Sequence, residues 1–305
     1  MIIDHINCID GTIMTDQNLT PEELLDIVEE KASDEKLQKV LARAGVGSRR
    51  EMERWIALGR VTINKEKAQL GDRVTWRDHI SVDGRQVDLV SPNNIERRVL
   101  IYNKPEGEIV TRSDPENRST VFDKLPRLKG ERWIVVGRLD INTAGLLLFT
   151  TDGELANSLM HPSTTIEREY AVRVMGHVTM DQVNAMHKGV LLDDGMARFN
   201  DIQEFGGEGI NRWYHVVIME GRNREVRRLW ESQGLKVNRL KRVRYGDVFL
   251  PPQLRAGMWM EMPQVDINAL SQFVGMRPKK VKRRLPKEQE SFDRQEKRQR
   301  TRRHA

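Results

Sequence analysis

Cysteine and long apolar runs are nearly absent from this sequence. Among 305 residues there is one cysteine, Cys8, which excludes an internal disulfide and a metal cluster held by thiolates. No apolar run approaches the ~20 residues that cross a bilayer. The first residues, "MIIDHINCIDGTIMTDQ", lack the basic segment and the apolar block of a secretory signal. These absences predict a cytoplasmic protein without a membrane partner.

The motifs that hold dinucleotides, nucleotide phosphates or a catalytic zinc are also missing. The sequence contains no GxGxxG pattern, no GxxxxGK followed by Ser or Thr, and no HExxH, and its seven histidines are scattered without ligand spacing. The glycine cluster Gly206–Gly209 is more typical of a turn than of a phosphate-binding loop. The expectation is therefore chemistry that needs neither a cofactor nor a metal ion.

Charge is distributed unevenly along the chain. Residues 1–35 carry ten acids and one lysine, whereas residues 276–305 carry thirteen Lys or Arg and four acids, within a net charge of +6. A basic folded part and a basic end are typical of a nucleic-acid-binding protein, although charge alone does not exclude an ordinary solvated surface. We expect residues 1–34 to be an acidic extension and residues 276–305 a basic disordered tail.

Residues 35–92 are predicted to form a small module of two helices followed by a short sheet. The apolar residues of the first helix recur at helical spacing: Leu37, Val40, Leu41 and Ala44. Ser48 and Glu51 form a capping box that starts the second helix. Apolar and polar residues then alternate, as in short strands joined by turns.

Basic side chains gather on or beside the two predicted helices. They are Lys39, Arg43, Arg49, Arg50 and Arg60. Arg49 and Arg50 stand at the start of the second helix, where cations are unfavourable unless something negative compensates them. Phosphate is the natural candidate, so we predict that these five residues contact the phosphates of a nucleic acid. The alternative, that Glu51 and Glu53 neutralise the two arginines, stays open.

Residues 93–275 are predicted to form a larger domain of the α/β (α+β) class. Residues 89–98 are interpreted as a linker, because "LVSPNNIERR" is polar and contains proline and asparagine. Strand-like and helix-like segments then alternate up to about Phe273. This pattern predicts a mixed sheet with helices on one side.

One carboxylate of the larger domain has an unusual position. Asp140 follows the strand-like segment "RWIVV", two residues after Arg138, and an apolar run begins a few residues later. Burying a charge is costly unless it is paired, so this acid is either part of a structural ion pair or the centre of the chemistry. Tyr170 lies in an alternating segment, on the same face as Val172 and Val174.

Four arginines mark the start of a helix in "EGRNREVRRLWE". They are Arg222, Arg224, Arg227 and Arg228. An acid, an aromatic ring and an arginine can form one site, in which the cation keeps the acid ionised. Taken singly, each of these residues is more typical of a structural role.

At these residues the sequence resembles a known family. "GRLDINTAGLLLFTTDGEL" is similar to the signature of the pseudouridine synthases of the ribosomal small-subunit-enzyme type, and "KPEG", "EREYAVRV" and "EGRNREVRRL" are similar to their other motifs. The module before them resembles the S4-like RNA-binding domain of that family, so the resemblance covers residues 35–262. It implies an enzyme, acting as a monomer without a cofactor, that isomerises a uridine of ribosomal RNA, with large-subunit RNA as the expected substrate.

The resemblance also implies roles for individual residues. Asp140 would be the catalytic aspartate; whether it attacks ribose C1′, removes a ribose proton or adds to the base stays open. Tyr170 would stack on the uracil, and Arg227 would pair with Asp140 and hold it ionised. Arg138 would fill the space that a flipped-out base leaves in the RNA stack.

Arg222 and Arg224 are expected to contact RNA beside this site. Two other functions remain open at the level of sequence. One is a non-catalytic RNA-binding protein that uses the front module and the basic tail. The other is a hydrolase that releases a base, for which the usual second carboxylate has no evident candidate.

Overall fold

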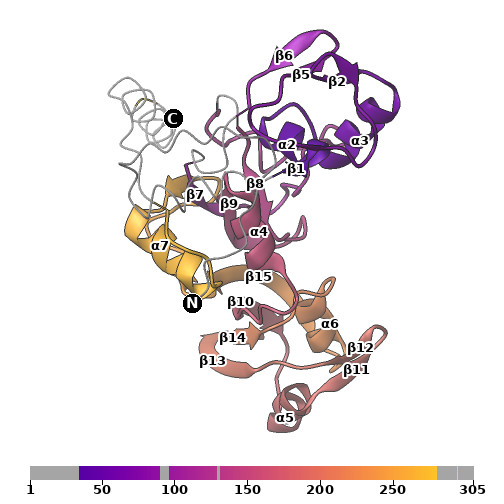
Figure 1. The fold of residues 1–305 in the computed structure, drawn as a ribbon. Helices are drawn as coiled ribbons and strands as arrows, with labels where there is room; N and C mark the ends of the chain where they lie inside the picture. Colours follow the sequence, from indigo (N-terminus) through magenta and orange to yellow (C-terminus); the bar gives the residue numbers. More distant parts are fainter. Residues whose placement is uncertain (1–33, 90–95, 129–130, 280–293, 295–305) are drawn as a thin grey trace, which may run out of the picture. The chain divides into compact units, whose positions relative to one another are not determined.

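The computed structural model describes residues 34–89, 96–128, 131–279 and 294 of the chain (Figure 1). The chain divides into two compact units between Val90 and Ser91. The acidic extension with Cys8 and most of the expected linker and basic tail lie outside the described residues. Within the described ranges, no helix has the length and hydropathy needed to span a membrane. Those ranges also contain no cluster of three or more metal-ligating side chains.

The first unit contains two helices and a small sheet, as the sequence predicts. Its helices and strands are β1 (Glu35–Lys36), α2 (Leu37–Arg43), α3 (Arg49–Ala57), β2 (Val61–Ile63), β3 (Glu66–Lys67), β4 (Arg73–Val74), β5 (Ile80–Val82) and β6 (Arg85–Val87). Four of the strands form an antiparallel sheet in the order β3-β2-β5-β6, and β1 pairs with β4.

Local signals explain how this unit folds. The Ser48 side chain accepts a hydrogen bond from the backbone N–H of Glu51, and the Glu51 carboxylate accepts one from the N–H of Ser48, so the predicted capping box is confirmed. Leu37 and Leu41 of α2 pack with Met52 of α3 in a fully buried core. The unit thus has a hydrophobic core of its own.

The second unit is built on one mixed sheet. Its strands are β7 (Val99–Lys104), β8 (Ile134–Val136), β9 (Ala144–Thr150), β10 (Arg168–Met175), β13 (Asp201–Glu208), β14 (Asn211–Ile218), β15 (Lys236–Tyr245), β16 (Val248–Phe249) and β17 (Trp259–Glu261). The order is β13-β14-β10-β15-β9-β7-β17, with β16 on β15 and β8 on β9. Only the pair β15–β9 is parallel among the described strands, which confirms the predicted mixed sheet.

Helices cover both faces of this sheet, so the expectation of helices on one side is wrong. The helices are α4 (Gly153–Met160), α5 (Met180–Lys188), α6 (Glu225–Glu231) and α7 (Gln264–Phe273), and β11 (Val190–Leu192) pairs with β12 (Gly195–Ala197) in a separate hairpin. Leu147 of β9 joins the core cluster of α5 and α6, whereas its neighbour Leu146 joins that of α4 and α7. Successive strand residues face opposite sides, so the continuous apolar run "GLLLF" indicates burial on both faces.

The C-terminal edge of the larger domain lies beyond the predicted boundary, and part of the expected linker is packed. Arg97, expected in the linker, is buried and donates to the carboxylate of Asp152 at 2.9 Å and to the carbonyl of Arg277 at 3.0 Å. Lys279, expected in the disordered tail, lies 3.5 Å from the same carboxylate. Arg97 lies inside the predicted range 93–275, whereas Arg277 and Lys279 extend the folded domain beyond its predicted end at residue 275.

One glycine permits the close crossing of the two central strands. Gly145 of β9 has φ +106°, and a Cβ atom at this position would lie 2.2 Å from the backbone oxygen of Arg242 on β15. No other residue fits without moving a strand. This crossing brings the loop before β9, which carries Asp140, next to the side chains of β15.

Candidate active site

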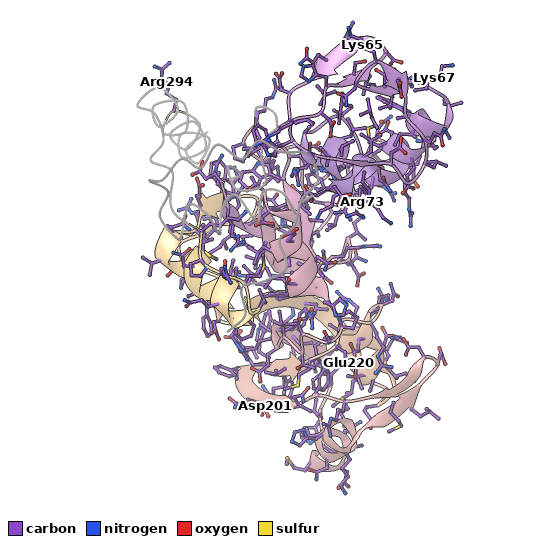
Figure 2. All side chains as sticks on the ribbon, viewed as in Figure 1. Lys65, Lys67, Arg73, Asp201, Glu220 and Arg294 are labelled. Carbon is purple, nitrogen blue, oxygen red and sulfur yellow. The ribbon has the colours of Figure 1, made fainter. Side chains whose placement is uncertain are left out.

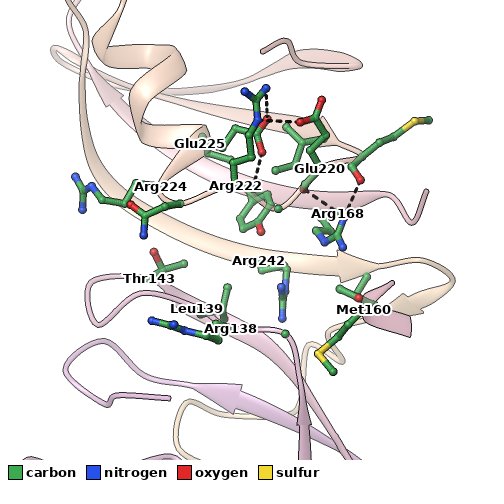
Figure 3. A pocket seen from close by; sticks show the side chains of 18 of the residues that line it. Arg138, Leu139, Thr143, Met160, Arg168, Glu220, Arg222, Arg224, Glu225 and Arg242 are labelled. Atoms are coloured by element: carbon green, nitrogen blue, oxygen red, sulfur yellow. Dashed lines mark hydrogen bonds and ion pairs between the residues drawn. The ribbon is translucent and has the colours of Figure 1, made fainter. Parts of the chain in front are cut away.

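A cavity of about 870 Å³ opens beside this crossing (Figure 3). It is lined by the loop between β8 and β9, the segment after α4, parts of β10 and β15, and the start of α6. The predicted site residues among its lining are Arg138, Asp140, Tyr170, Arg222 and Arg224. Arg227 does not line it. The tertiary structure thus joins segments that are up to about a hundred residues apart in the sequence.

The loop that carries Asp140 is held by its backbone. The carbonyl of Asp140 accepts a hydrogen bond from the N–H of Thr143 at 3.0 Å, and the carbonyl of Ile141 accepts one from the N–H of Gly107 at 2.8 Å. The Asp140 side chain is half-buried and forms no hydrogen bond or ion pair with the described residues. Its carboxylate is therefore available to a ligand in the cavity.

A buried lysine, whose role the sequence analysis did not recognise, anchors the same loop. Lys104 at the end of β7 is 0% exposed, and its Nζ donates to the carbonyls of Pro105 (3.0 Å), Asp140 (3.1 Å) and Thr143 (2.8 Å). Burial lowers its pKa to about 8, although Glu108, Asp140 and Glu106 oppose that shift. The sequence signal for this role was the position of a lysine at the end of the apolar strand "VLIYNK", where a buried cation needs partners.

The stability of the protein should depend on the titration of Lys104. The folded protein releases this proton near pH 8 and the unfolded chain near pH 10.4, so the unfolding free energy should rise with pH between these values. Denaturant unfolding of wild type and Lys104→Met across this range isolates the effect. We expect wild type to gain about 2–3 kcal/mol relative to the variant. A difference that does not change with pH would contradict the lowered pKa.

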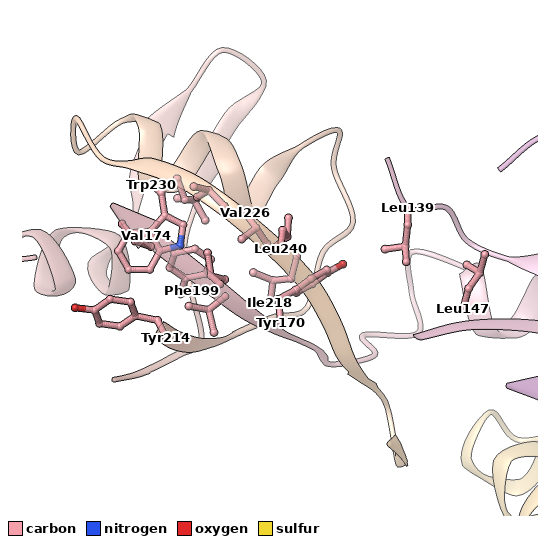
Figure 4. Close-up of a cluster of buried hydrophobic side chains, with 14 of the residues drawn as sticks. Leu139, Leu147, Tyr170, Val174, Phe199, Tyr214, Ile218, Val226, Trp230 and Leu240 are labelled. Atoms are coloured by element: carbon pink, nitrogen blue, oxygen red, sulfur yellow. The ribbon is translucent and has the colours of Figure 1, made fainter. Parts of the chain in front are cut away.

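Tyr170 presents its ring to the cavity from an apolar wall. The side chain is 7% exposed and belongs to the same buried cluster as Val172 and Val174, which confirms the predicted shared face. Its ring lies beside Ile218 and Leu240 (Figure 4). An aromatic face in such a wall can support a planar base.

Arg227 is placed differently from the prediction. In the described part of the chain it forms no ion pair with Asp140; its Nη1 donates to the carbonyl of Val237 at 3.0 Å and its Nη2 to the carbonyl of Asn142 at 2.7 Å. Burial and nearby Arg224 lower its pKa, and Asp140 acts in the opposite direction. Arg227 therefore holds the backbone of the Asp140 loop and influences the carboxylate only through space.

The other arginines at the start of α6 differ in how strongly the protein engages them. Arg222 contacts the carboxylates of Glu220 at 2.8 Å and Asp194 at 3.2 Å, so its charge is already paired within the protein. Arg224 is exposed, has φ +48°, and lies 3.6 Å from Glu231. Of the two predicted RNA contacts, Arg224 has the freer side chain.

The predicted basic residues of the first unit fall into two groups, those with a carboxylate partner and those without one. Lys39 and Arg43 both pair with Glu35. Arg60 pairs with Asp83, and its guanidinium lies 4.0 Å from the centroid of the Trp55 ring.

Arg49 and Arg50 are exposed and have no ion pair or side-chain hydrogen bond with the described residues. Neither Glu51 nor Glu53 forms an ion pair with them: Glu51 accepts from the Ser48 backbone and Glu53 from the Gln38 amide. Further cations of this unit, such as Lys65 and Lys67, also extend into solvent (Figure 2).

Comparisons with known proteins agree with the two units. The family model of the RNA pseudouridylate synthases matches residues 98–232, and that of the S4 domain matches residues 35–80. A solved structure described as a pseudouridylate synthase superposes with a TM-score of 0.53 at 26% identity, over 77% of this chain and 99% of its own.

Several curated relatives are named ribosomal large subunit pseudouridine synthase B. The protein of Pseudomonas aeruginosa is 60% identical over 87% of this chain and 69% of its own length. That of Vibrio cholerae is 60% identical over 81% and 77%, and that of Escherichia coli O157:H7 is 57% identical over 80% and 85%. The chain belongs to the RNA pseudouridylate synthase family.

Proposed function

We propose that this chain converts one uridine of large-subunit ribosomal RNA to pseudouridine, as a monomer in the cytoplasm and without a cofactor. The observation that carries the proposal is the cavity in which Asp140 and Tyr170 lie together, within a domain of the pseudouridylate synthase family. The names of the relatives from Pseudomonas and Vibrio support the choice of large-subunit RNA.

The reaction rearranges atoms that are already in the substrate. The bond between ribose C1′ and uracil N1 breaks, the base turns, and C5 bonds to C1′; C5 loses a proton and N1 gains one. No electrons enter or leave, so no redox partner is needed. Attack on C1′, removal of a ribose proton and addition to the base all require an ionised Asp140 carboxylate.

The other residues of the cavity then have separate tasks. Tyr170 supports the uracil ring against the apolar wall. Arg138, exposed on the Asp140 loop, occupies the place of the flipped base in the RNA. Lys104 and Arg227 fix the loop through its carbonyls, so that the carboxylate reaches the ribose in one orientation.

Mapping pseudouridines in ribosomal RNA from cells with and without the gene tests the proposal. One large-subunit site should lose its modification, and the purified protein should restore it on RNA from the deficient cells. No change at any site would refute the proposal. Release of free uracil by the purified protein would instead indicate a hydrolase.

Two deletions should separate the role of the first unit from that of the tail. Removing residues 280–305 leaves the packed residues 276–279 in place and should weaken binding to all RNAs. The slope of log affinity against log salt should fall by roughly 0.7–0.9 for each lost phosphate contact, without changing the modified uridine. Removing residues 35–90 should instead abolish the choice of the correct uridine. A tail deletion that redirects modification would contradict this division.

A further inference from the structure

A buried cation that belongs to none of the family motifs quoted above lies in the wall of the cavity. Arg242 of β15 is 2% exposed and lines the cavity. The strand register places it opposite Tyr170 on one side and opposite Gly145 on the other. In the close-up, its side chain extends from β15 into the space between Leu139 and Met160 (Figure 3). Arg242 therefore lies at the centre of the site.

The hydrogen-bonding capacity of this guanidinium is largely unused. Its Nε donates to the carbonyl of Leu146 at 2.8 Å, and its Cζ lies 5.1 Å from the centroid of the Tyr245 ring. The terminal nitrogens bond to no described residue, and Nη2 is fully buried without a partner. Buried donors are almost always paired, and because Arg242 lines the cavity, a group that enters it can supply the missing acceptor.

No carboxylate of the described residues forms an ion pair with Arg242, and this includes Asp140, which lines the same cavity. Glu220 and Glu225, the glutamates of the cavity lining, are both engaged by Arg222. A further cation lies nearby, since the Cζ of Arg168 is 5.2 Å from the centroid of the same Tyr245 ring. A buried cation without a counter-ion costs several kcal/mol, and a neutral uracil carbonyl would not compensate it. An oxyanion would, and arginine is well suited to bind phosphate oxygens in pairs.

We propose that Arg242 binds a phosphodiester group of the substrate strand next to the flipped uridine, and so fixes the ribose relative to Asp140. This rests on the proposed function, because the phosphate belongs to the RNA that the cavity accepts. Arg242 is here a binding residue, distinct from the exposed cations that meet RNA on the surface of the protein.

Neutral phosphate analogues test this contact directly. Two RNA fragments with the mapped uridine each carry one methylphosphonate, on its 5′ or its 3′ side. Single-turnover kinetics of wild type at increasing enzyme concentrations give the half-saturating concentration for each fragment. We expect one of the two substitutions to raise it about 10- to 100-fold, the range of one lost charged hydrogen bond. A change of less than threefold in the half-saturating concentration at both positions would overturn the proposal, regardless of any result with protein variants.

A cycle with Arg242→Gln assigns the contact to this side chain. The variant should lose about the same factor on unmodified RNA, and almost nothing more on the sensitive methylphosphonate fragment. If the loss from Arg242→Gln and the loss from the methylphosphonate multiply instead, another residue binds the phosphate. Arg242→Lys, which keeps the charge, should lose less than Arg242→Gln, and thermal unfolding shows whether either variant is folded. Equal losses in two folded variants would contradict the role of charge.

Arg244→Gln is the matched control for this cycle. Arg244 lies on the same strand, is paired at 2.8 Å with both Glu167 and Glu169, and does not line the cavity. The loss caused by Arg244→Gln should be independent of the methylphosphonate, so the two factors should multiply. A wild type that forms no pseudouridine would refute the proposed function, whereas an active wild type insensitive to both analogues refutes only the Arg242 contact.

Discussion

Replacing Asp140 with asparagine is expected to abolish pseudouridine formation while leaving RNA binding almost unchanged. The amide keeps the shape of the side chain but supplies neither a nucleophile nor a base. The rate should fall at least about 1000-fold, or ~4 kcal/mol of activation free energy, with affinity changed less than about threefold. The side chain has no described partner and the loop is held by backbone groups, so the variant should unfold like wild type.

Glu220→Gln is the control for the loss of a negative charge from the same cavity. Glu220 lines the cavity and pairs with Arg222, but it lies outside the loop of Asp140. Its replacement should change the rate less than about tenfold, since its ion pair with Arg222 is exposed. Turnover of Asp140→Asn within tenfold of wild type would refute the catalytic role of Asp140.

Arg227→Ala is expected to give the second largest loss of activity. The substitution leaves the carbonyls of Asn142 and Val237 without this donor, so the Asp140 loop loses the link to β15 that Arg227 provides. Displacement of a reacting group by about 1 Å can cost 100-fold, and we expect kcat to fall by about that factor. The KM should change less than about threefold, because the guanidinium does not line the cavity.

Arg224→Ala provides the comparison within the same segment. Arg224 is exposed and makes one long contact with Glu231, so its loss should raise KM and reduce the salt dependence of binding while kcat stays within threefold. A larger loss of kcat in Arg224→Ala than in Arg227→Ala would show that Arg224, and not Arg227, positions the Asp140 loop. Thermal unfolding of both variants separates a loss of folding from a loss of activity.

Much of the protein could be predicted from local sequence patterns. The capping box at Ser48, the helical spacing from Leu37 and the alternation around Tyr170 each depend on residues a few positions apart, and each is confirmed. The mixed sheet also followed from alternating strand-like and helix-like segments. Family motifs further identified Asp140 and Tyr170, which the structure brings into one cavity.

The partners of the buried charges could not be predicted in the same way. Lys104 and Arg227 bind carbonyls of the Asp140 loop across the domain, and Arg242 is left with unpaired donors beside the crossing at Gly145. Residue type states that a buried cation needs a partner, but not which oxygen will lie within 3 Å of it. That choice follows from the strand order and register, which are set by long-range packing of both sheet faces rather than by neighbouring residues in the chain.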